Sequence, residues 1–270
     1  MLRQVLLGFV LAALIGFVAH RRGSLSKSGV AGAVIIGTLI FGLGGWAWGA
    51  LLVVFFVSSS ALSHYQGAVK APLAEKFSKG HQRDLAQTMA NGGAGALIVS
   101  ANLIWPHPVW WAAFAGAMAT VNADTWATEL GVLSKTKPRH ILTGHEVETG
   151  ASGGITVSGT LAALGGAALV SLLAASFNIA SAQPFSLSLF FFLSASAAGL
   201  LGSLFDSLLG ATVQAMYYCN HCQKETERHP AHTCGNVTRQ TRGWHWLDND
   251  WVNFLSSLAG AVVAVGAVIG

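Results

Sequence analysis

Charged side chains are scarce in this sequence. It has 15 Lys and Arg and 11 Asp and Glu among 270 residues, so 10% of the chain is charged, against about 25% in an average soluble domain. So few charges do not cover the surface of a water-soluble globule of this size, which excludes an ordinary soluble enzyme. The chain also has only 6 prolines and 3 cysteines, which argues against a fibrous protein and a disulfide scaffold.

Apolar residues are abundant instead, at 53% of the chain. Because a transmembrane helix needs about 20 mainly apolar residues, we predict about eight spans, at residues 4–19, 29–45, 46–63, 86–105, 109–132, 153–177, 186–214 and 251–269. The first run lacks a cleavage pattern and is expected to be retained. The second and third share FGLGGWAWG with no charged break, which fits either a tight hairpin or one re-entrant unit. The expected fold is an all-α polytopic bundle forming a single domain over 1–270, with a cytoplasmic loop insertion at 215–250.

The basic residues fall into alternate loops. All of them except Arg3 follow spans one, three, five and seven: Arg21, Arg22, Lys27, Lys70, Lys76, Lys79, Arg83, Lys135, Lys137, Arg139, Lys224, Arg228, Arg239 and Arg242. By the positive-inside rule these loops are cytoplasmic and both termini lie outside, in a membrane that we expect to be a prokaryotic inner membrane. Basic cytoplasmic loops account for the net charge of +4, so no nucleic-acid partner is expected.

Three carboxylates lie inside predicted spans: Asp124, Glu129 and Asp206. Ionisable groups are costly there and are by default candidates for a functional site. Asn91 and Asn253 lie in the same cytoplasmic halves of other spans. We predict that Asp124 and Asp206 hold Mg²⁺, a cation that prefers oxygen ligands. Glu129 would serve a second metal or a basic partner such as Lys135. The alternative is that these groups only link helices by hydrogen bonds.

The segment ETGASGGITVSGT, residues 148–160, opens the sixth predicted span at its cytoplasmic end. Glycines allow a backbone to approach a ligand closely, and the first N–H groups of a helix bind anions. We therefore predict phosphate or nucleotide contacts from Thr149, Gly150, Ser152, Gly153 and Gly154, with Thr156 as a further hydroxyl donor. The pattern is not a Walker A loop. Packing of small residues between helices is the alternative explanation.

All three cysteines lie in CNHCQKETERHPAHTCG. Cys219 and Cys222 form a CxxC pair, and Cys234 with His232 or His229 completes the ligand set of a structural zinc knuckle. A redox CxxC is the alternative.

Further on, WLDNDWVN places a polar cluster at the start of the last span. There Asp248 fits helix capping, whereas Asn249 and Asn253 are predicted to contact metal or nucleotide.

Six motifs, in order along the chain, carry a resemblance: RRGSLSKSG, RDLAQTMANGG, NADTWATELG, TGASGGITVSGT, GSLFDSLLGATVQ and WLDNDWVN. Together they resemble the integral-membrane family that includes plant phytyl-phosphate kinase and animal transmembrane protein 19, distantly similar to dolichol and phytol kinases. The resemblance implies a polytopic kinase that passes a phosphoryl group from a nucleotide, often CTP, to an isoprenoid monophosphate. The family's acidic and asparagine positions map onto Asn91, Asp124, Glu129, Asp206 and Asn253. The cysteine cluster is not part of this resemblance.

Kinase chemistry fits the residues. A phosphate monoester is already an anionic nucleophile, so the protein must mainly bring two polyanions together and neutralise them with Mg²⁺ and basic groups. By position, Arg83 and Lys135 are the candidate charge clamps. An ion-coupled transporter is the rival hypothesis, since intramembrane acids beside glycine-rich helices also occur in carriers. A membrane scaffold whose zinc loop binds a partner is the third.

Overall fold

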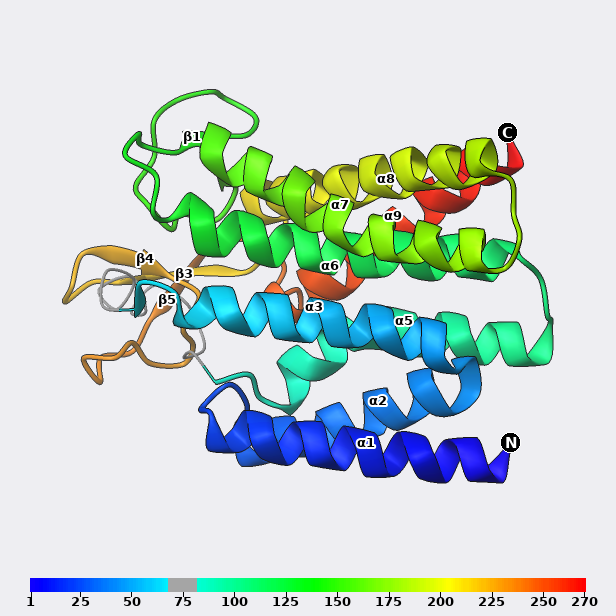
Figure 1. The fold of residues 1–270 in the computed structure, drawn as a ribbon. Helices are drawn as coiled ribbons and strands as arrows, with labels where there is room; N and C mark the ends of the chain where they lie inside the picture. Colours follow the sequence, from blue (N-terminus) through cyan, green and yellow to red (C-terminus); the bar gives the residue numbers. More distant parts are fainter. Residues whose placement is uncertain (68–81) are drawn as a thin grey trace.

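The computed structural model describes residues 1–67 and 82–270 of the protein. Within these ranges, long helices lie side by side along one axis (Figure 1). Their bounds are α1 Leu2–Arg21, α2 Lys27–Gly44, α3 Trp46–His64, α5 Leu85–Ile104, α6 Val109–Gly131, α7 Val157–Ala180, α8 Phe185–Thr212 and α9 Asn249–Ile269. The expected all-α polytopic bundle is confirmed.

Six of these helices are long and apolar enough to cross a membrane, namely α1, α2, α3, α7, α8 and α9. The other two, α5 and α6, have 20 and 23 residues and so reach the same length. Their average hydropathy is lower because α5 is rich in Gly and polar residues and α6 contains both Asp124 and Glu129. Gly45, at φ 86°, separates α2 from α3, so the second and third spans form a tight hairpin of two complete helices.

The two ends of the bundle differ in character. Both chain termini lie at one end, and all the short strands lie at the other, which we call the loop end (Figure 1). The segments that follow α1, α3, α6 and α8 meet at the loop end. Every described Lys and Arg except Arg3 belongs to these segments or to the adjoining helix ends. Lys70, Lys76 and Lys79 lie outside the described residues.

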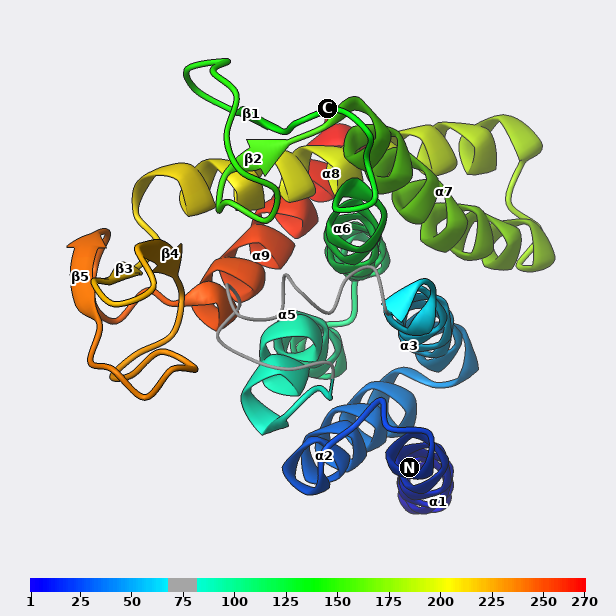
Figure 2. The ribbon, with the colours of Figure 1, turned by 90° about the vertical axis from the view of Figure 1, so that its left-hand side faces the viewer.

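The helix α6 lies at the centre of the bundle (Figure 2). Every residue from Ala112 to Ala123 is buried, as expected of a helix surrounded by protein on all sides. Small residues bring the neighbouring helix α9 close: a Cβ on Gly116 would lie 2.5 Å from the carbonyl oxygen of Gly260. Asn122 also serves packing, because its amide donates to the Gly166 carbonyl (2.7 Å) and its Oδ1 accepts from Ser58 (2.9 Å). The centre of the fold is therefore a rigid, closely packed frame.

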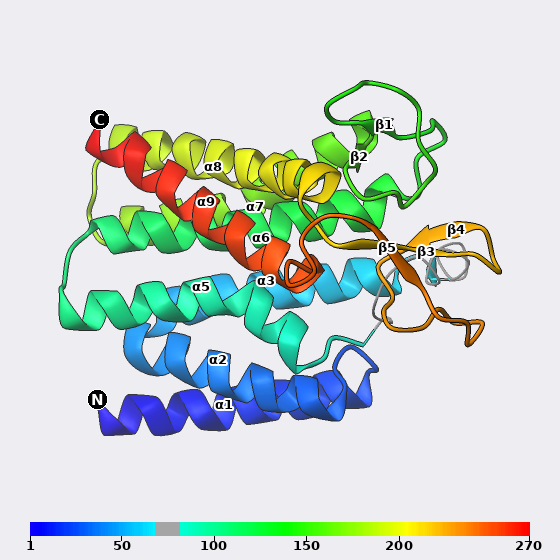
Figure 3. The same ribbon diagram turned by 180° about the vertical axis from the view of Figure 1, so that it is seen from behind.

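The loop end carries two small antiparallel sheets (Figure 3). One pairs β1 (Arg139–His140) with β2 (Gly154–Ile155). The other has the order β4-β3-β5 and lies within the predicted insertion, with bounds β3 Met216–Cys219, β4 Lys224–Thr226 and β5 Arg239–Arg242. The sequence predicted a loop here, not strands. These runs of two to four residues are too short to show the alternating pattern of a strand.

Candidate functional site

A polar cavity of about 330 Å³ opens among α3, α5, α6, α7, α8 and α9 towards the loop end. Its wall also includes Arg83, Val132, Pro138, the segment 149–156 and two residues beyond α8, Gln214 and Glu227. Each of these six helices contributes residues from the end or half nearest the loops. Side chains from distant parts of the sequence therefore converge on one level of the bundle, as a shared binding site requires.

Carboxylates dominate this cavity: Asp124, Glu129, Asp206 and Glu227 all line it. Asp206 Oδ2 accepts a hydrogen bond from Ser256 (2.9 Å), and Glu129 Oε1 accepts one from Ser63 (2.6 Å). Asp124 and Asp206 come from facing helices and repel each other electrostatically. Among the described residues, no group donates a hydrogen bond to Asp124. Two acids that face each other, neither of them ion-paired with a described Lys or Arg, form a donor set suited to a divalent cation with oxygen ligands.

Arg83 is the only cation among the described Lys and Arg residues to line this cavity. It lies just before α5, where its backbone pairs with Ser24 and Ser26 of the segment after α1. Its side chain donates to Ser60 Oγ (3.1 Å) and lies over the ring of Phe55. Burial lowers the pKa of the guanidinium, and the nearby Glu129 carboxylate opposes that shift. A half-buried arginine held in this way is fixed in place before any ligand arrives.

The segment 149–154 forms a turn against α8 instead of starting a helix. Gly150 and Gly153 have φ of 79° and 81°, a region that favours glycine. A Cβ on Gly153 would also lie 2.5 Å from Ala211 Cβ, so no larger residue fits. No described residue accepts a hydrogen bond from the backbone N–H of Gly150, Ser152 or Gly153. The N–H of Ala151, between them, donates to the Glu148 carbonyl. Unpaired N–H groups close together in such turns form concave sites for anions.

Hydrogen bonds tie this turn to α8 and to the insertion. Ser152 Oγ lies 3.0 Å from the Gly210 carbonyl oxygen and 2.9 Å from Gln214 Oε1. Gln214 in turn donates to Glu227 Oε1 (3.0 Å), and Arg242 donates to the Gly210 carbonyl (2.6 Å). The position of the glycine turn therefore depends on the insertion as well as on the helices.

Most residues predicted for the site line this one cavity: Arg83, Asn91, Asp124, Glu129, Thr149, Gly150, Ser152, Gly153, Gly154, Asp206, Asn249 and Asn253. Lys135 is not among the residues that line it.

The helix α7 begins at Val157, later than the span predicted from 153, because Thr156 caps it by accepting from the Gly159 N–H (2.9 Å). The hydroxyls of Thr156 and Ser152 are thus used within the protein. Asp248 caps α9 as expected.

Sequence reasoning missed Ser63 and Glu227. Ser63 is one of several serines at the end of α3, and only its contact with Glu129 distinguishes it. Glu227 lies within the cysteine segment, which the sequence predicts to be a separate structural loop, yet its side chain lines the cavity. The sequence gives no clear signal for this role, because Lys224, Glu225, Glu227 and Arg228 stand together between the cysteines. Only the fold shows that the Glu227 side chain lines the cavity.

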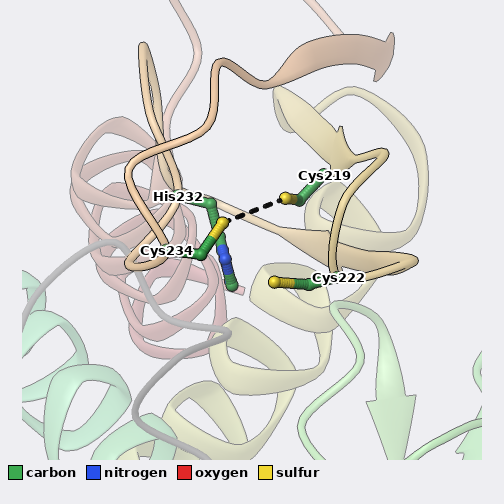
Figure 4. A group of neighbouring side chains, drawn as sticks. All are labelled: Cys219, Cys222, His232 and Cys234. Atoms are coloured by element: carbon green, nitrogen blue, oxygen red, sulfur yellow. Dashed lines mark hydrogen bonds between the residues drawn. The ribbon is translucent and has the colours of Figure 1, made fainter.

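The four predicted zinc ligands come together in the insertion (Figure 4). One ligand atom from each of Cys219, Cys222, His232 and Cys234 lies within 4.8 Å of the others. The Sγ atoms of Cys219 and Cys234 are 3.6 Å apart, close to the roughly 3.8 Å that tetrahedral Zn–S bonds of about 2.3 Å would give. His229 instead stacks on Tyr217, at 4.7 Å between ring centroids. The set fits one tetrahedral metal ion.

The thiols of this cluster are electrostatically coupled. Hydrogen bonds from Asn236 and His232 lower the pKa of Cys234 to about 5. Contacts with Cys234 and Cys219 raise the pKa of Cys222 to about 11. A bound divalent cation would stabilise the thiolate form of its cysteine ligands.

Together, the bundle and its buried acidic cavity define a polytopic integral membrane protein with a polar site near one end. The chain matches the family model described as Integral membrane protein DUF92 over residues 10–261. It belongs to that family. The resemblance seen in its motifs is thus confirmed as membership of an integral membrane family with a plant member.

Three relatives illustrate the family. Protein PGR of Arabidopsis thaliana is 34% identical over 273 residues, covering 94% of this chain and 93% of the plant protein. An uncharacterized membrane protein of Methanocaldococcus jannaschii is 29% identical and covers 77% of this chain and 82% of its own length. An uncharacterized membrane protein of Synechocystis is 26% identical, and the match covers 90% of this chain and 82% of that protein. No solved structure matches the chain. None of these names states an enzymatic activity.

Proposed function

We propose that the protein is a kinase that transfers a phosphoryl group from a nucleoside triphosphate, with CTP favoured, to an isoprenoid monophosphate. One observation supports this proposal most: a single cavity combines facing carboxylates, unpaired backbone N–H groups and Arg83. Phosphoryl transfer needs both a metal site and anion-binding groups. A carrier of cations alone would need only the acids, so the glycine turn and Arg83 favour the kinase.

Each part of the cavity has a proposed role. Asp124 and Asp206 would hold Mg²⁺, which when bound neutralises the phosphate charges. The N–H groups of Gly150, Ser152 and Gly153 would bind nucleotide phosphate oxygens. Asn249 and Asn253 would orient the donor from α9, and Asn91 would do so from α5. Glu129 accepts a hydrogen bond from Ser63 and lies near Arg83. Arg83 would therefore be the basic group beside it in the cavity, which Lys135 does not line.

The reaction needs no strong base. An oxygen of the lipid monophosphate forms a bond to the terminal phosphorus of the nucleotide. The bond from that phosphorus to its bridging oxygen breaks, and the nucleoside diphosphate leaves with the electron pair. The products are a lipid diphosphate and a nucleoside diphosphate. The protein's contribution is to position two anions and offset their repulsion.

The loop end is proposed to face the cytoplasm. It carries nearly all the described basic residues, and the positive-inside rule places such loops on that side. Soluble nucleotide would then reach the cavity from the cytoplasm, and both termini would lie outside.

A direct assay tests the activity. Purified protein in phospholipid vesicles with Mg²⁺ and γ-labelled CTP or ATP should convert phytyl monophosphate to the diphosphate, and chelation of Mg²⁺ should stop the reaction. The rival transporter hypothesis is tested with the same vesicles. Uptake of a labelled cation, combined with no transfer of label to any prenyl monophosphate, would replace the kinase proposal with transport.

We further propose that Cys219, Cys222, His232 and Cys234 bind one structural zinc ion. With four protein ligands the site has no open position for a substrate. Its role would be to hold the insertion, which supplies Glu227 to the cavity wall and Arg242 to the base of the glycine turn.

Two histidine variants test this site. His232→Ala should weaken zinc binding at least about 100-fold, because it removes a ligand from a four-coordinate set. His229→Ala should retain about one zinc per chain, because His229 lies outside the cluster. Elemental analysis of protein purified without added metal measures both. Zinc lost equally from the two variants, or absent from the unmodified protein, would refute the site.

A further inference from the structure

A second cavity, of about 360 Å³, lies beside the polar one. It is bounded by α1, α2, α3 and the start of α5, and its lining is almost wholly apolar. Phe41, Leu52, Val53 and Ile15 are typical of its wall. We call it the apolar groove. Its volume is within the range of about 300–1,000 Å³ that is usual for small-molecule sites.

The apolar groove and the polar cavity share two wall residues, Arg83 and Asn91. Arg83 is the only charged residue lining the apolar groove within the described chain. From there the groove extends along α3 as far as Trp46, about 15 Å from Phe56 at a rise of 1.5 Å per residue. The result is an elongated apolar space with a cation at the end that adjoins the acidic cavity.

We propose that the apolar groove binds the hydrocarbon chain of the phosphate acceptor, with the phosphate held at Arg83. This proposal rests on the proposed function for the phosphate end and adds where the chain lies. Charge complementarity selects the occupant, since an anionic head fits the single arginine and an uncharged chain fits the remaining wall. A groove of this length accommodates several isoprene units, so it would distinguish long acceptors from short ones.

Two small residues leave the groove open. Ala33 on α2 and Ala50 on α3 are half-buried and line it. A phenylalanine at either position would occupy space that the chain needs. Ala31, two residues from Ala33 on the same helix, is exposed and lines neither cavity. It offers a matched control for the added ring.

Kinetics on two acceptors form the first test. Ala33→Phe and Ala50→Phe should raise the KM for phytyl monophosphate at least about tenfold. The kcat and KM for the short dimethylallyl monophosphate should stay within about twofold, and Ala31→Phe should match the unmodified protein with both. Equal losses with both acceptors, or no loss with the long one, would overturn the proposal.

Photolabelling tests the groove without turnover. A phytyl monophosphate carrying a diazirine on its chain should label peptides of α1, α2 or α3, and unlabelled phytyl monophosphate should compete. Labelling of other helices would show that the acceptor chain binds elsewhere. The proposal would also fail if a diazirine phosphatidylcholine labelled the groove equally and phytyl monophosphate did not displace it. If labelling succeeds and no phosphoryl transfer occurs, the kinase proposal fails, whereas the proposal that the groove binds the lipid chain is retained.

Discussion

Asp124→Asn should lower kcat/KM for the phosphoryl transfer by about 10²–10³-fold, the usual effect of removing one electrostatic stabiliser from an active site. The substitution keeps the size of the side chain and removes its charge. Because Asp124 accepts no hydrogen bond from the described residues and repels Asp206, the variant should fold normally. The Mg²⁺ concentration that gives half-maximal activity should rise. Radiolabel transfer measured over a series of Mg²⁺ concentrations gives both values.

Thermal unfolding separates this role from a structural one. Mg²⁺ should raise the Tm of the unmodified protein, because a ligand that binds only the folded state stabilises it. It should leave the Tm of Asp124→Asn nearly unchanged. Without Mg²⁺ the variant should be at least as stable as the unmodified protein, since one of two repelling charges is gone. Glu146→Gln, which removes an exposed acid 3.9 Å from Lys137, is the control. Turnover of Asp124→Asn within about twofold of the unmodified protein would refute the assigned metal site.

The helices and the positions of the acids were predictable because the bilayer imposes simple rules. Apolar runs of fixed length mark spans, and alternate basic loops mark one end of the bundle. Asp124, Asp206 and Asn253 stood out because polar groups are rare in such runs. Their depth within each span then placed them at one level, and the structure brings them to one cavity.

Other features depend on contacts between segments far apart in sequence. Asn122 lies on the same helix as Asp124 and has similar polarity, yet it binds Gly166 and Ser58 and serves packing. Residues 149–153 resembled a helix start because glycine and small residues allow both helix packing and a turn; contact with Ala211 selects the turn. Glu227 was missed because no local pattern tells which way a loop carboxylate points.

Arg83 provides the other large expected effect. Arg83→Met should lower kcat/KM for the lipid monophosphate about 10–100-fold, the value of a charge-assisted hydrogen bond to a phosphate. The loss should appear mainly in the KM for the lipid and not in the KM for the nucleotide, because Arg83 lies where the two cavities meet.

Two further variants identify what Arg83 contributes. Arg83→Lys should recover only part of the loss, since lysine keeps the charge and lacks the planar fork of donors. Arg21→Met should behave like the unmodified protein, because Arg21 lies over Phe17 and lines neither cavity. The backbone pairing of residue 83 with Ser24 and Ser26 does not depend on its side chain, so folding should persist in all three variants. A rise in the KM for the nucleotide alone would show that Arg83 binds the nucleotide donor and not the lipid acceptor.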